Sequence, residues 1–225
     1  MTRVAITTDR FDSVASAYAR RGLDPVQLPC IHVEPAGSDA LADAREAAAG
    51  AGLLLVTSPR TVHLLWPGQE MPAVDVAAVG ESTAAAAAGR GGRVVAAGRS
   101  GLLSLIDTVA DRFRGARVVF PHAGGSDLGA SQRLRQLTAA LEEHVVYRTV
   151  PVGPDLTPVE AVSFASPSAV QGWLGTRDFD DLVLGVIGKT TWAAVARVRE
   201  PDVVATRPSH PALALSLSNY LEKSA

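Results

Sequence analysis

The chain has 225 residues, of which 47% are hydrophobic and 20% are charged, and its formal net charge is −2. This composition is typical of a globular protein with one large core or two smaller ones, and the small charge excludes a general attraction to nucleic acid or an anionic membrane. The single cysteine, Cys30, excludes an internal disulfide, and the five histidines lack the spacing of a metal site. Because the sequence opens directly into a predicted strand without a basic leader, and no apolar run could span a membrane, we expect a cytoplasmic protein.

Short β-branched runs alternate with alanine- and leucine-rich segments along the chain. The pattern predicts strands near residues 3–8, 25–29, 53–57, 75–79, 93–97, 117–121, 144–149, 161–165, 183–187 and 202–206. It predicts helices in most of the gaps, among them 12–22, 39–49, 101–113, 129–143 and 210–222. Alternation of this kind is typical of βαβ units, in which parallel sheets are covered by helices on both faces.

A motif that consists of a predicted strand, Ser-Pro and a predicted helix occurs twice, as LVTSPRTVHLLW at 55–66 and as SFASPSAVQGW at 163–173. Ser58 lies 22 residues before Gly80, and Ser166 lies 22 residues before Gly188. Each glycine is followed by a helical segment, a strand and a further helix. Four elements at constant spacing predict an internal duplication, and therefore two similar domains.

The two copies differ at their C-terminal ends. The first continues into RVVFPHAGGSD, a helix and a closing strand, whereas the second ends with the chain. The N-terminal RVAITTDRFDS resembles that continuation, so we expect the missing units of the second copy at the front of the chain. The resulting prediction is a discontinuous domain of residues 1–33 plus 151–225, an inserted domain of residues 36–147, and β-like crossings near 31–35 and 146–152.

Polar loops follow the predicted strands at their carboxyl ends, where open parallel sheets bind ligands. Most of these loops offer a hydroxyl group and a helix N-terminus, which attracts phosphate and carboxylate groups. Ser and Thr at such positions are also ordinary N-caps that stabilise a helix by about 1 kcal/mol, and for any single loop capping is the favoured interpretation. Taken together, the loops favour a shared, large anionic ligand. They are Thr7–Arg10, Thr57–Arg60, Gly80–Thr83, Gly98–Ser100, His122–Ser126, Ser166–Ser168, Gly188–Thr191 and Arg207–His210.

Several familiar site signatures are missing from the sequence. GVIGKTT lacks the glycine spacing of a P-loop, and HAGGSDLG lacks the GxGxxG spacing of a dinucleotide site. No GxSxG elbow or Cys–His pattern indicates a nucleophile. We therefore expect any enzyme activity to need no metal, no nucleotide and no covalent intermediate.

Five short motifs occur in an order and spacing that resemble the uroporphyrinogen-III synthase family: TSPRTV, AVGESTA, VVYRT, FASPSAV and IGKTTWA. The resemblance covers nearly the whole chain. It implies two similar, doubly wound parallel-sheet α/β domains, flavodoxin-like or Rossmann-like, that are joined by a two-stranded β-ladder and have the active site in the cleft between them. It also implies a cofactor-independent lyase that dehydrates hydroxymethylbilane, a linear tetrapyrrole with eight carboxylates, and cyclises it with inversion of ring D to give uroporphyrinogen III. We expect a monomer that binds this small molecule and neither nucleic acid nor a membrane.

The resemblance also implies roles for individual residues. Tyr147 matches the tyrosine of the family's VYxT motif and is the candidate proton donor, because a phenol is protonated at neutral pH; alternatively it only packs in the connecting ladder. Thr191 matches the threonine of the IGxTTA motif and is a candidate partner of the substrate or the leaving water, with capping as the alternative. Lys189, Trp192 and His210 depart from the residues that are usual in the family. From the polar loops, the candidate substrate-binding residues are Ser58, Arg60, Ser82, Thr83, Ser166, Ser168 and Thr190, with Arg10, Arg148, Lys189 and Arg207 as weaker candidates.

Two other functions fit the same sequence. One is a non-catalytic two-domain binding protein that closes on an anionic small molecule, although such proteins often carry an export signal. The other is a family member that has lost its activity and serves regulation, and the presence of Tyr147 argues against it.

Overall fold

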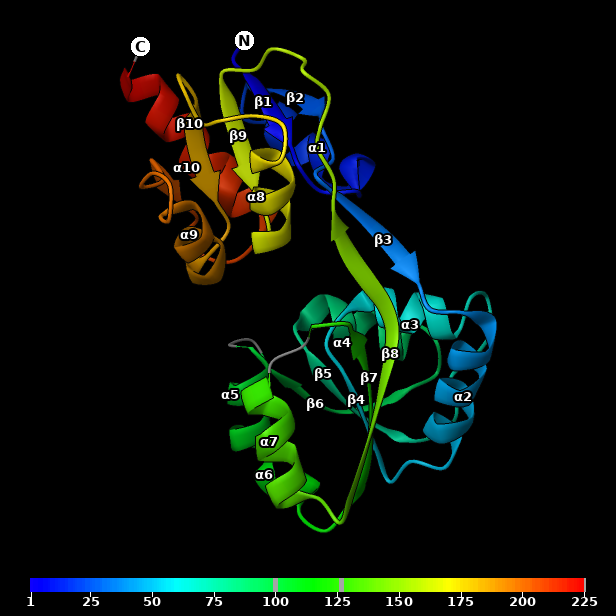
Figure 1. Ribbon diagram of the computed structural model, residues 1–225. Coiled ribbons are helices and arrows are strands. Elements are labelled where there is room, and N and C mark those ends of the chain that lie inside the picture. Colours follow the sequence, from blue (N-terminus) through cyan, green and yellow to red (C-terminus); the bar gives the residue numbers. More distant parts are fainter. Residues whose placement is uncertain (99–100, 126–127, 225) are drawn as a thin grey trace. The chain divides into compact units, whose positions relative to one another are not determined.

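The computed structural model describes residues 1–98, 101–125 and 128–224. The chain forms two compact units (Figure 1). The terminal unit consists of Met1–Val33 and Thr149–Ala225, and the inserted unit of Glu34–Arg148. Each contains one sheet with helices packed on it, so the predicted α/β fold with two parallel-sheet domains is confirmed. Among the described residues, no helix is long and apolar enough to cross a membrane.

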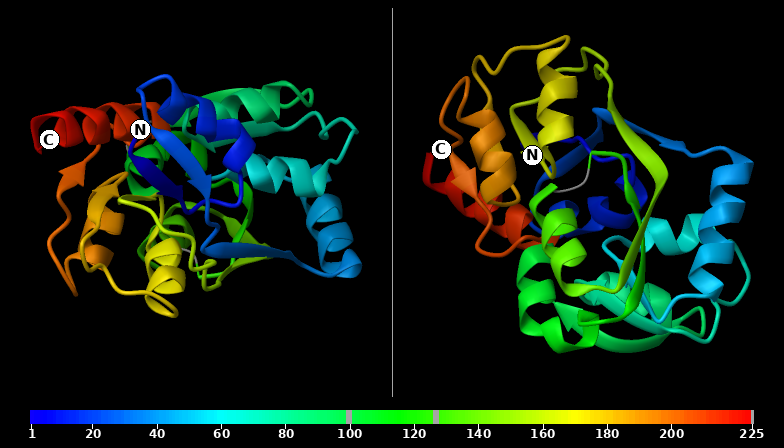
Figure 2. Two further views of the ribbon diagram at one scale, coloured as in Figure 1. Left: turned by 90° about the horizontal axis from the view of Figure 1, so that it is seen from above. Right: turned by 60° about the horizontal axis from the view of Figure 1, so that its bottom comes forward.

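The terminal unit has a parallel sheet in the strand order β11-β10-β9-β1-β2. Its strands are β1 (Arg3–Ile6), β2 (Asp24–Gln27), β9 (Ala161–Phe164), β10 (Val183–Val186) and β11 (Val203–Val204). Its helices are α1 (Phe11–Ala19), α8 (Pro167–Leu174), α9 (Lys189–Val195) and α10 (His210–Ser224). Although they come from opposite ends of the chain, α1 and α10 lie side by side (Figures 1 and 2). They pack on one face of the sheet, and α8 and α9 cover the other face.

The packing of α8 depends on a glycine. A Cβ atom at Gly172 would lie 2.1 Å from the carbonyl oxygen of Cys30 and 2.5 Å from that of Val152. Only a residue without a side chain lets the helix approach these two backbone segments so closely. The Cys30 thiol lies in the same packed region, where burial raises its pKa to about 12 against the opposing charge of Arg177. Cys30 is therefore a structural residue that stays protonated at neutral pH.

The inserted unit has a sheet in the strand order β3-β8-β7-β4-β5-β6. Its strands are β3 (Ile31–Pro35), β4 (Leu53–Val56), β5 (Asp75–Val79), β6 (Arg93–Gly98), β7 (Arg117–Ala123) and β8 (Ala140–Pro151). Its helices are α2 (Ser38–Ala49), α3 (Pro59–Leu65), α4 (Glu81–Ala88), α5 (Leu102–Thr108), α6 (Ala110–Phe113) and α7 (Leu128–Leu137). Strands β3 and β8 are neighbours in this sheet, and each continues past the boundary of the unit. The four residues of β4 are all buried, as expected for a strand covered on both faces.

The two sheets share one spatial arrangement of strands. The strands β8-β7-β4-β5-β6 of the inserted unit occupy the same positions as β2-β1-β9-β10-β11 of the terminal unit. Numbered along the chain, the terminal unit has the flavodoxin-like order 2-1-3-4-5, whereas the inserted unit has the Rossmann-like order 3-2-1-4-5. In this correspondence β1 and β2 take the places of β7 and β8. The N-terminal segment thus supplies the elements that the second copy of the repeat lacks. In sheets of this type, ligands bind where the strand order reverses, which is between β7 and β4 in one unit and between β1 and β9 in the other.

Every predicted strand overlaps an observed one, but two predicted helices are wrong in part. The helix expected over 129–143 ends at Leu137, and β8 begins at Ala140, which pairs with Arg117 of β7. The segment ALEE has good helix formers, yet pairing with the buried strand β7 outweighs this weak local preference. The helix expected over 101–113 is divided into α5 and α6 at Val109, whose φ of −120° and ψ of 32° are not helical.

Candidate active site

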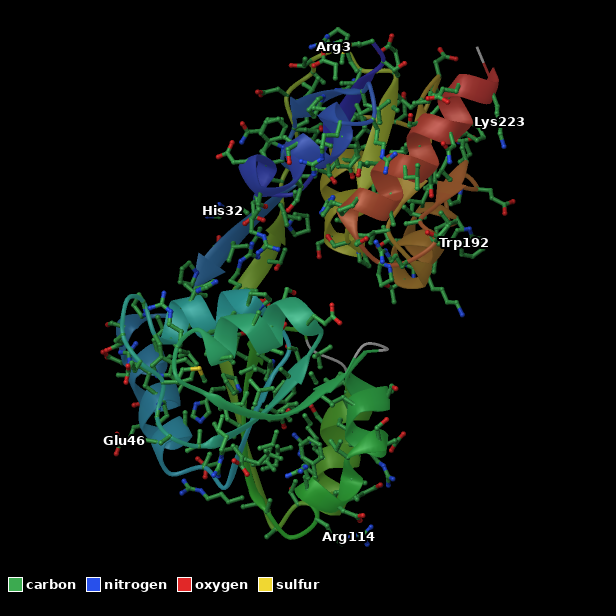
Figure 3. The ribbon with its side chains drawn as sticks, turned by 180° about the vertical axis from the view of Figure 1, so that it is seen from behind. Arg3, His32, Glu46, Arg114, Trp192 and Lys223 are labelled. Atoms are coloured by element: carbon green, nitrogen blue, oxygen red, sulfur yellow. The ribbon has the colours of Figure 1, made fainter. Side chains whose placement is uncertain are left out.

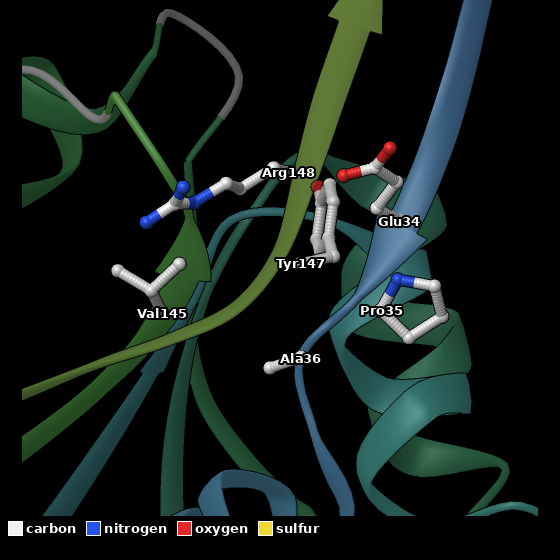
Figure 4. A pocket seen from close by; sticks show the side chains of 6 residues that line it. All are labelled: Glu34, Pro35, Ala36, Val145, Tyr147 and Arg148. Atoms are coloured by element: carbon white, nitrogen blue, oxygen red, sulfur yellow. The ribbon is translucent and has the colours of Figure 1, made fainter.

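A cavity of about 240 Å³ lies in the inserted unit where β3 and β8 run next to each other (Figure 4). The backbone N–H of Ala36 donates a hydrogen bond to the carbonyl oxygen of Val146 at 2.9 Å, which ties the end of β3 to β8. The residues that line the cavity are Glu34, Pro35, Ala36, Val145, Tyr147 and Arg148.

Tyr147 forms a wall of this cavity (Figure 4). The residue is only 7% exposed, so its ring is held by packing. Its hydroxyl group makes no hydrogen bond to any residue that the structure describes. A phenol that is fixed in a cavity without a protein partner can donate its proton to a bound ligand.

Arg60 lies against Tyr147. The guanidinium carbon of Arg60 is 5.6 Å from the centroid of the Tyr147 ring, which is within the range of a cation–π interaction. The start of α3 sets this position, because Ser58 is the N-cap of the helix and its hydroxyl oxygen accepts a hydrogen bond from the backbone N–H of Arg60 at 3.2 Å. Pro59 occupies the first helical position. A backbone N–H there would have no partner within the helix, so proline costs no hydrogen bond at this position. The predicted Ser58, Arg60 and Tyr147 thus belong to one local arrangement.

The terminal unit repeats this capping arrangement. Ser166 is the N-cap of α8, with Pro167 in the first helical position, and its hydroxyl oxygen accepts a hydrogen bond from the backbone N–H of Ala169 at 3.2 Å. The repeated Ser-Pro phrase is therefore a helix-capping motif in both units, as the simpler interpretation of each loop predicts. Ser168 follows in the first turn of α8 and is half-buried.

The second repeated motif begins α4 and α9. Gly80 and Gly188 are the N-caps, and neither helix has a side-chain cap. Gly80 has a φ of 85°, in the left-handed region that favours glycine. Thr83 and Thr191 occupy equivalent positions in the first turn and are each 1% exposed. Capping by Thr191 is therefore wrong, and its contact with the substrate stays a prediction.

The remaining candidates are exposed or lie outside the described residues. Ser82, Lys189, Thr190, Arg10, Arg148 and Arg207 are exposed. Of these, Arg148 lines the cavity beside Tyr147. The predicted loop residues Arg99, Ser100 and Ser126 lie outside the described part of the chain. Among the described residues, no group of three or more His, Cys, Asp or Glu side chains is placed to hold a metal ion.

A buried polar cluster lies in the terminal unit. The Tyr18 hydroxyl is 2.5 Å from Ser163 Oγ and 3.1 Å from His210 Nδ1. Burial, reinforced by the nearby charge of Arg10, lowers the pKa of His210 to about 4, and burial raises the pKa of Tyr18 above its usual value. At neutral pH His210 is therefore uncharged, and a hydrogen bond joins its Nδ1 to the Tyr18 hydroxyl. The sequence singles out His210 as unusual, but nothing in it identifies Tyr18 or Ser163 as the partners.

Sequence reasoning also missed the residues that face Tyr147 across the cavity. Glu34, Pro35 and Ala36 come from the first crossing segment, and Tyr147 comes from the second. A signal for them exists, because both crossings are expected to be β-like and two such strands can pair. A paired arrangement would have placed Glu34 close to the motif that contains Tyr147.

Comparisons with known proteins agree with this fold. A family model described as uroporphyrinogen-III synthase HemD matches residues 12–214. A mutant uroporphyrinogen III synthase from Thermus thermophilus has a TM-score of 0.66 and 16% identity, over 99% of this chain and 100% of its own. The uroporphyrinogen-III synthetase of Helicobacter pylori has a TM-score of 0.67 and 16% identity, over 97% of this chain and 99% of its own. No curated protein sequence matches significantly. Since the family model covers most of the sequence, the chain belongs to the uroporphyrinogen-III synthase family.

Proposed function

We propose that the chain dehydrates hydroxymethylbilane and closes it, with inversion of ring D, to uroporphyrinogen III, and that Tyr147 donates the proton to the leaving hydroxyl. Membership of the family supports the reaction. The observation that supports the role of Tyr147 is its fixed phenol, which lines a cavity with no hydrogen-bond partner among the described residues.

The substrate supplies much of the driving force for the first step. Once the terminal hydroxyl accepts a proton, the electron pair of the adjacent pyrrole nitrogen expels it as water and leaves a cationic azafulvene. The protein needs only an acid at this point, and general-acid assistance typically contributes about 10²–10⁴-fold. When Tyr147 gives up its proton, the guanidinium of Arg60 over the ring stabilises the resulting phenolate.

The second step depends on geometry. The substituted α-carbon of ring D must attack the azafulvene, although the unsubstituted α-carbon of the same ring would close the macrocycle without inversion. Holding the chain in one reactive conformation can lower a barrier by about 7–11 kcal/mol at best. We propose that the carboxylates of the substrate are held for this purpose by cationic side chains and by hydroxyl groups in the first turns of α4, α8 and α9. These residues are Arg10, Arg60, Ser82, Thr83, Ser168, Lys189 and Thr190, while Thr191 is the candidate partner of the substrate or the leaving water.

The proposal includes a monomer that works in the cytoplasm on a small molecule, without nucleic acid, a membrane or a cofactor. A formal net charge of −2 supports a substrate site made of local cations rather than a broad basic surface. Size-exclusion chromatography with light scattering, at several concentrations, tests the monomer directly.

An isomer assay tests the reaction. Purified protein is added to freshly prepared hydroxymethylbilane, and the porphyrin is identified after oxidation. We expect isomer III at a rate proportional to the protein concentration. Formation of isomer I alone, at the rate found without protein, would instead indicate a non-catalytic binding protein or an inactive family member.

A further inference from the structure

The reaction of the proposed function needs a base as well as an acid. Breaking the C–O bond consumes one proton, because the hydroxyl leaves as water. Ring D then forms a bond through its substituted α-carbon, its old bond to the neighbouring methylene breaks, and that methylene becomes the new azafulvene. The last C–C bond forms at the unsubstituted α-carbon of ring D, whose C–H bond breaks and releases one proton. A group in the site must accept this proton, and Tyr147 must regain one before the next turnover.

The cavity beside Tyr147 contains a carboxylate. Glu34 lines it together with Pro35, Ala36, Val145 and Arg148. Proline, alanine and valine side chains accept no proton, and a guanidinium is already fully protonated at any physiological pH. Of the side chains that line the cavity, Glu34 therefore carries the basic group that is suited to this step.

The Glu34 carboxylate is not neutralised within the described part of the protein. It makes no ion pair or hydrogen bond with a described residue. Arg148 lines the same cavity but packs over Gly124, since its Cγ and Nε lie 3.0 and 3.5 Å from the position that a Cβ on Gly124 would take. Figure 4 shows the Arg148 side chain and the Glu34 carboxylate pointing to different sides of Tyr147. A carboxylate without a fixed cation partner is free to contact a bound substrate and accept a proton from it.

A carboxylate in this cavity would weaken substrate binding, because the expected substrate carries many carboxylates of its own. Like charges repel, and the repulsion grows when a bound ligand displaces water from between them. A side chain that only bound the substrate would be better as a cation or an amide. The presence of Glu34 beside the candidate acid is accounted for by proton transfer.

We propose that Glu34 is the catalytic base that accepts the proton from the unsubstituted α-carbon of ring D and returns it to the Tyr147 phenolate. This inference rests on the proposed function. The transfer is downhill, because a carboxylic acid is a much stronger acid than a phenol. After it, Glu34 is again a carboxylate and Tyr147 again a phenol, and the water that left carries the oxygen of the substrate. No oxidant, reductant or co-reactant is needed.

The test compares Glu34→Gln with wild type and with Glu46→Gln. Glu46 lies on the outer side of α2 in the same unit, and it is exposed and does not line the cavity (Figure 3). Both substitutions remove one negative charge. The turnover of each protein is measured with hydroxymethylbilane and with the same substrate deuterated at the unsubstituted α-carbon of ring D. Glu34→Asp serves as the conservative variant.

We expect Glu34→Gln to lower kcat by about 10²-fold or more, as for the loss of a general base, while the product remains isomer III. Proton removal then limits turnover, so a primary deuterium isotope effect should appear in this variant and be weaker in wild type. Glu34→Asp should restore part of the rate, and Glu46→Gln should behave as wild type. A Glu34→Gln protein that turns over at the wild-type rate, or that is slower without an isotope effect, would overturn the inference. Wild-type protein that forms no isomer III would instead overturn the proposed function.

Discussion

The guanidinium carbon of Arg60 lies 5.6 Å from the centre of the Tyr147 ring, although one residue lies in the first turn of a helix and the other lies in the second half of a long strand. The Ser58 cap fixes the first turn of α3, and burial fixes the ring of Tyr147. The cation and the phenol are therefore both positioned before any ligand binds. Such preorganisation is what a site needs to stabilise charge that develops during a reaction.

Tyr147→Phe should remove the proton donor and leave the cavity wall in place. We expect kcat to fall by about 10²–10⁴-fold, the usual contribution of a general acid, with the thermal unfolding temperature nearly unchanged. The measurement is the initial rate of isomer III formation together with a thermal unfolding curve. Undiminished turnover would exclude Tyr147 as the donor.

Arg60→Met should weaken the stabilisation of the phenolate while keeping a side chain of similar length. A cation–π contact contributes about 0.5–2 kcal/mol, so we expect kcat to fall by roughly tenfold. Arg112→Met is the matched control, because Arg112 is an exposed arginine on α6 of the same unit that lines none of the Tyr147 cavity. If both variants lose the same activity, the contact with Tyr147 has no specific role.

Ser166→Ala and Ser168→Ala should separate capping from substrate binding. Ser166 caps α8, so its loss should reduce the free energy of unfolding by about 1 kcal/mol without raising KM. Ser168 caps nothing, so its substitution should leave stability unchanged and raise KM if the hydroxyl binds the substrate. Denaturant titration and steady-state kinetics on both variants give the comparison. A raised KM in Ser166→Ala with normal stability would reverse the assignment for that residue.

Gly172→Ala should destabilise the terminal unit strongly. The added methyl group would overlap the backbone carbonyl oxygens of Cys30 and Val152, which cannot move aside as a flexible side chain could. We expect a loss of about 3 kcal/mol or more in the free energy of unfolding. In the control Gly188→Ala, the nearest heavy atom to the added group is Cβ of Pro208 at 4.0 Å. Chemical denaturation should show a much smaller change for this control, and equal changes would contradict the packing argument.

The stability of the protein should depend on pH through His210. The folded protein holds the pKa of His210 at about 4, against an ordinary value of 6.5, so the unfolded chain binds a proton first as the pH falls. The free energy of unfolding should therefore decrease between pH 6.5 and pH 4, with a slope of up to about 1.4 kcal/mol per pH unit from this one proton. His210→Asn keeps a polar side chain that can hydrogen-bond to the Tyr18 hydroxyl but cannot titrate, and its stability should depend less steeply on pH over this interval. Equal slopes in both proteins would show that other groups carry the dependence.

The sequence predicts the order of elements better than it predicts contacts between them. Constant spacing between Ser58 and Gly80 and between Ser166 and Gly188 is a local signal, and it predicts the two similar domains that the matching arrangement of strands in both sheets agrees with. The end of α7 is not a local property, because the segment from Ala140 becomes a strand only by pairing with β7. The same limit applies to the partners of His210, since Tyr18 and Ser163 reach it only through tertiary packing.

The position of the two chain ends in one sheet has a consequence for synthesis on the ribosome. Strand β1 lies between β2 and β9, and α1 packs beside α10, so β1 and α1 lack β9 and α10 until the last third of the chain has emerged. The inserted unit, by contrast, is continuous in sequence and complete once Arg148 has been made. The middle of this protein can therefore fold first, while an apolar strand at the front waits with an open edge, where association with other chains is a hazard.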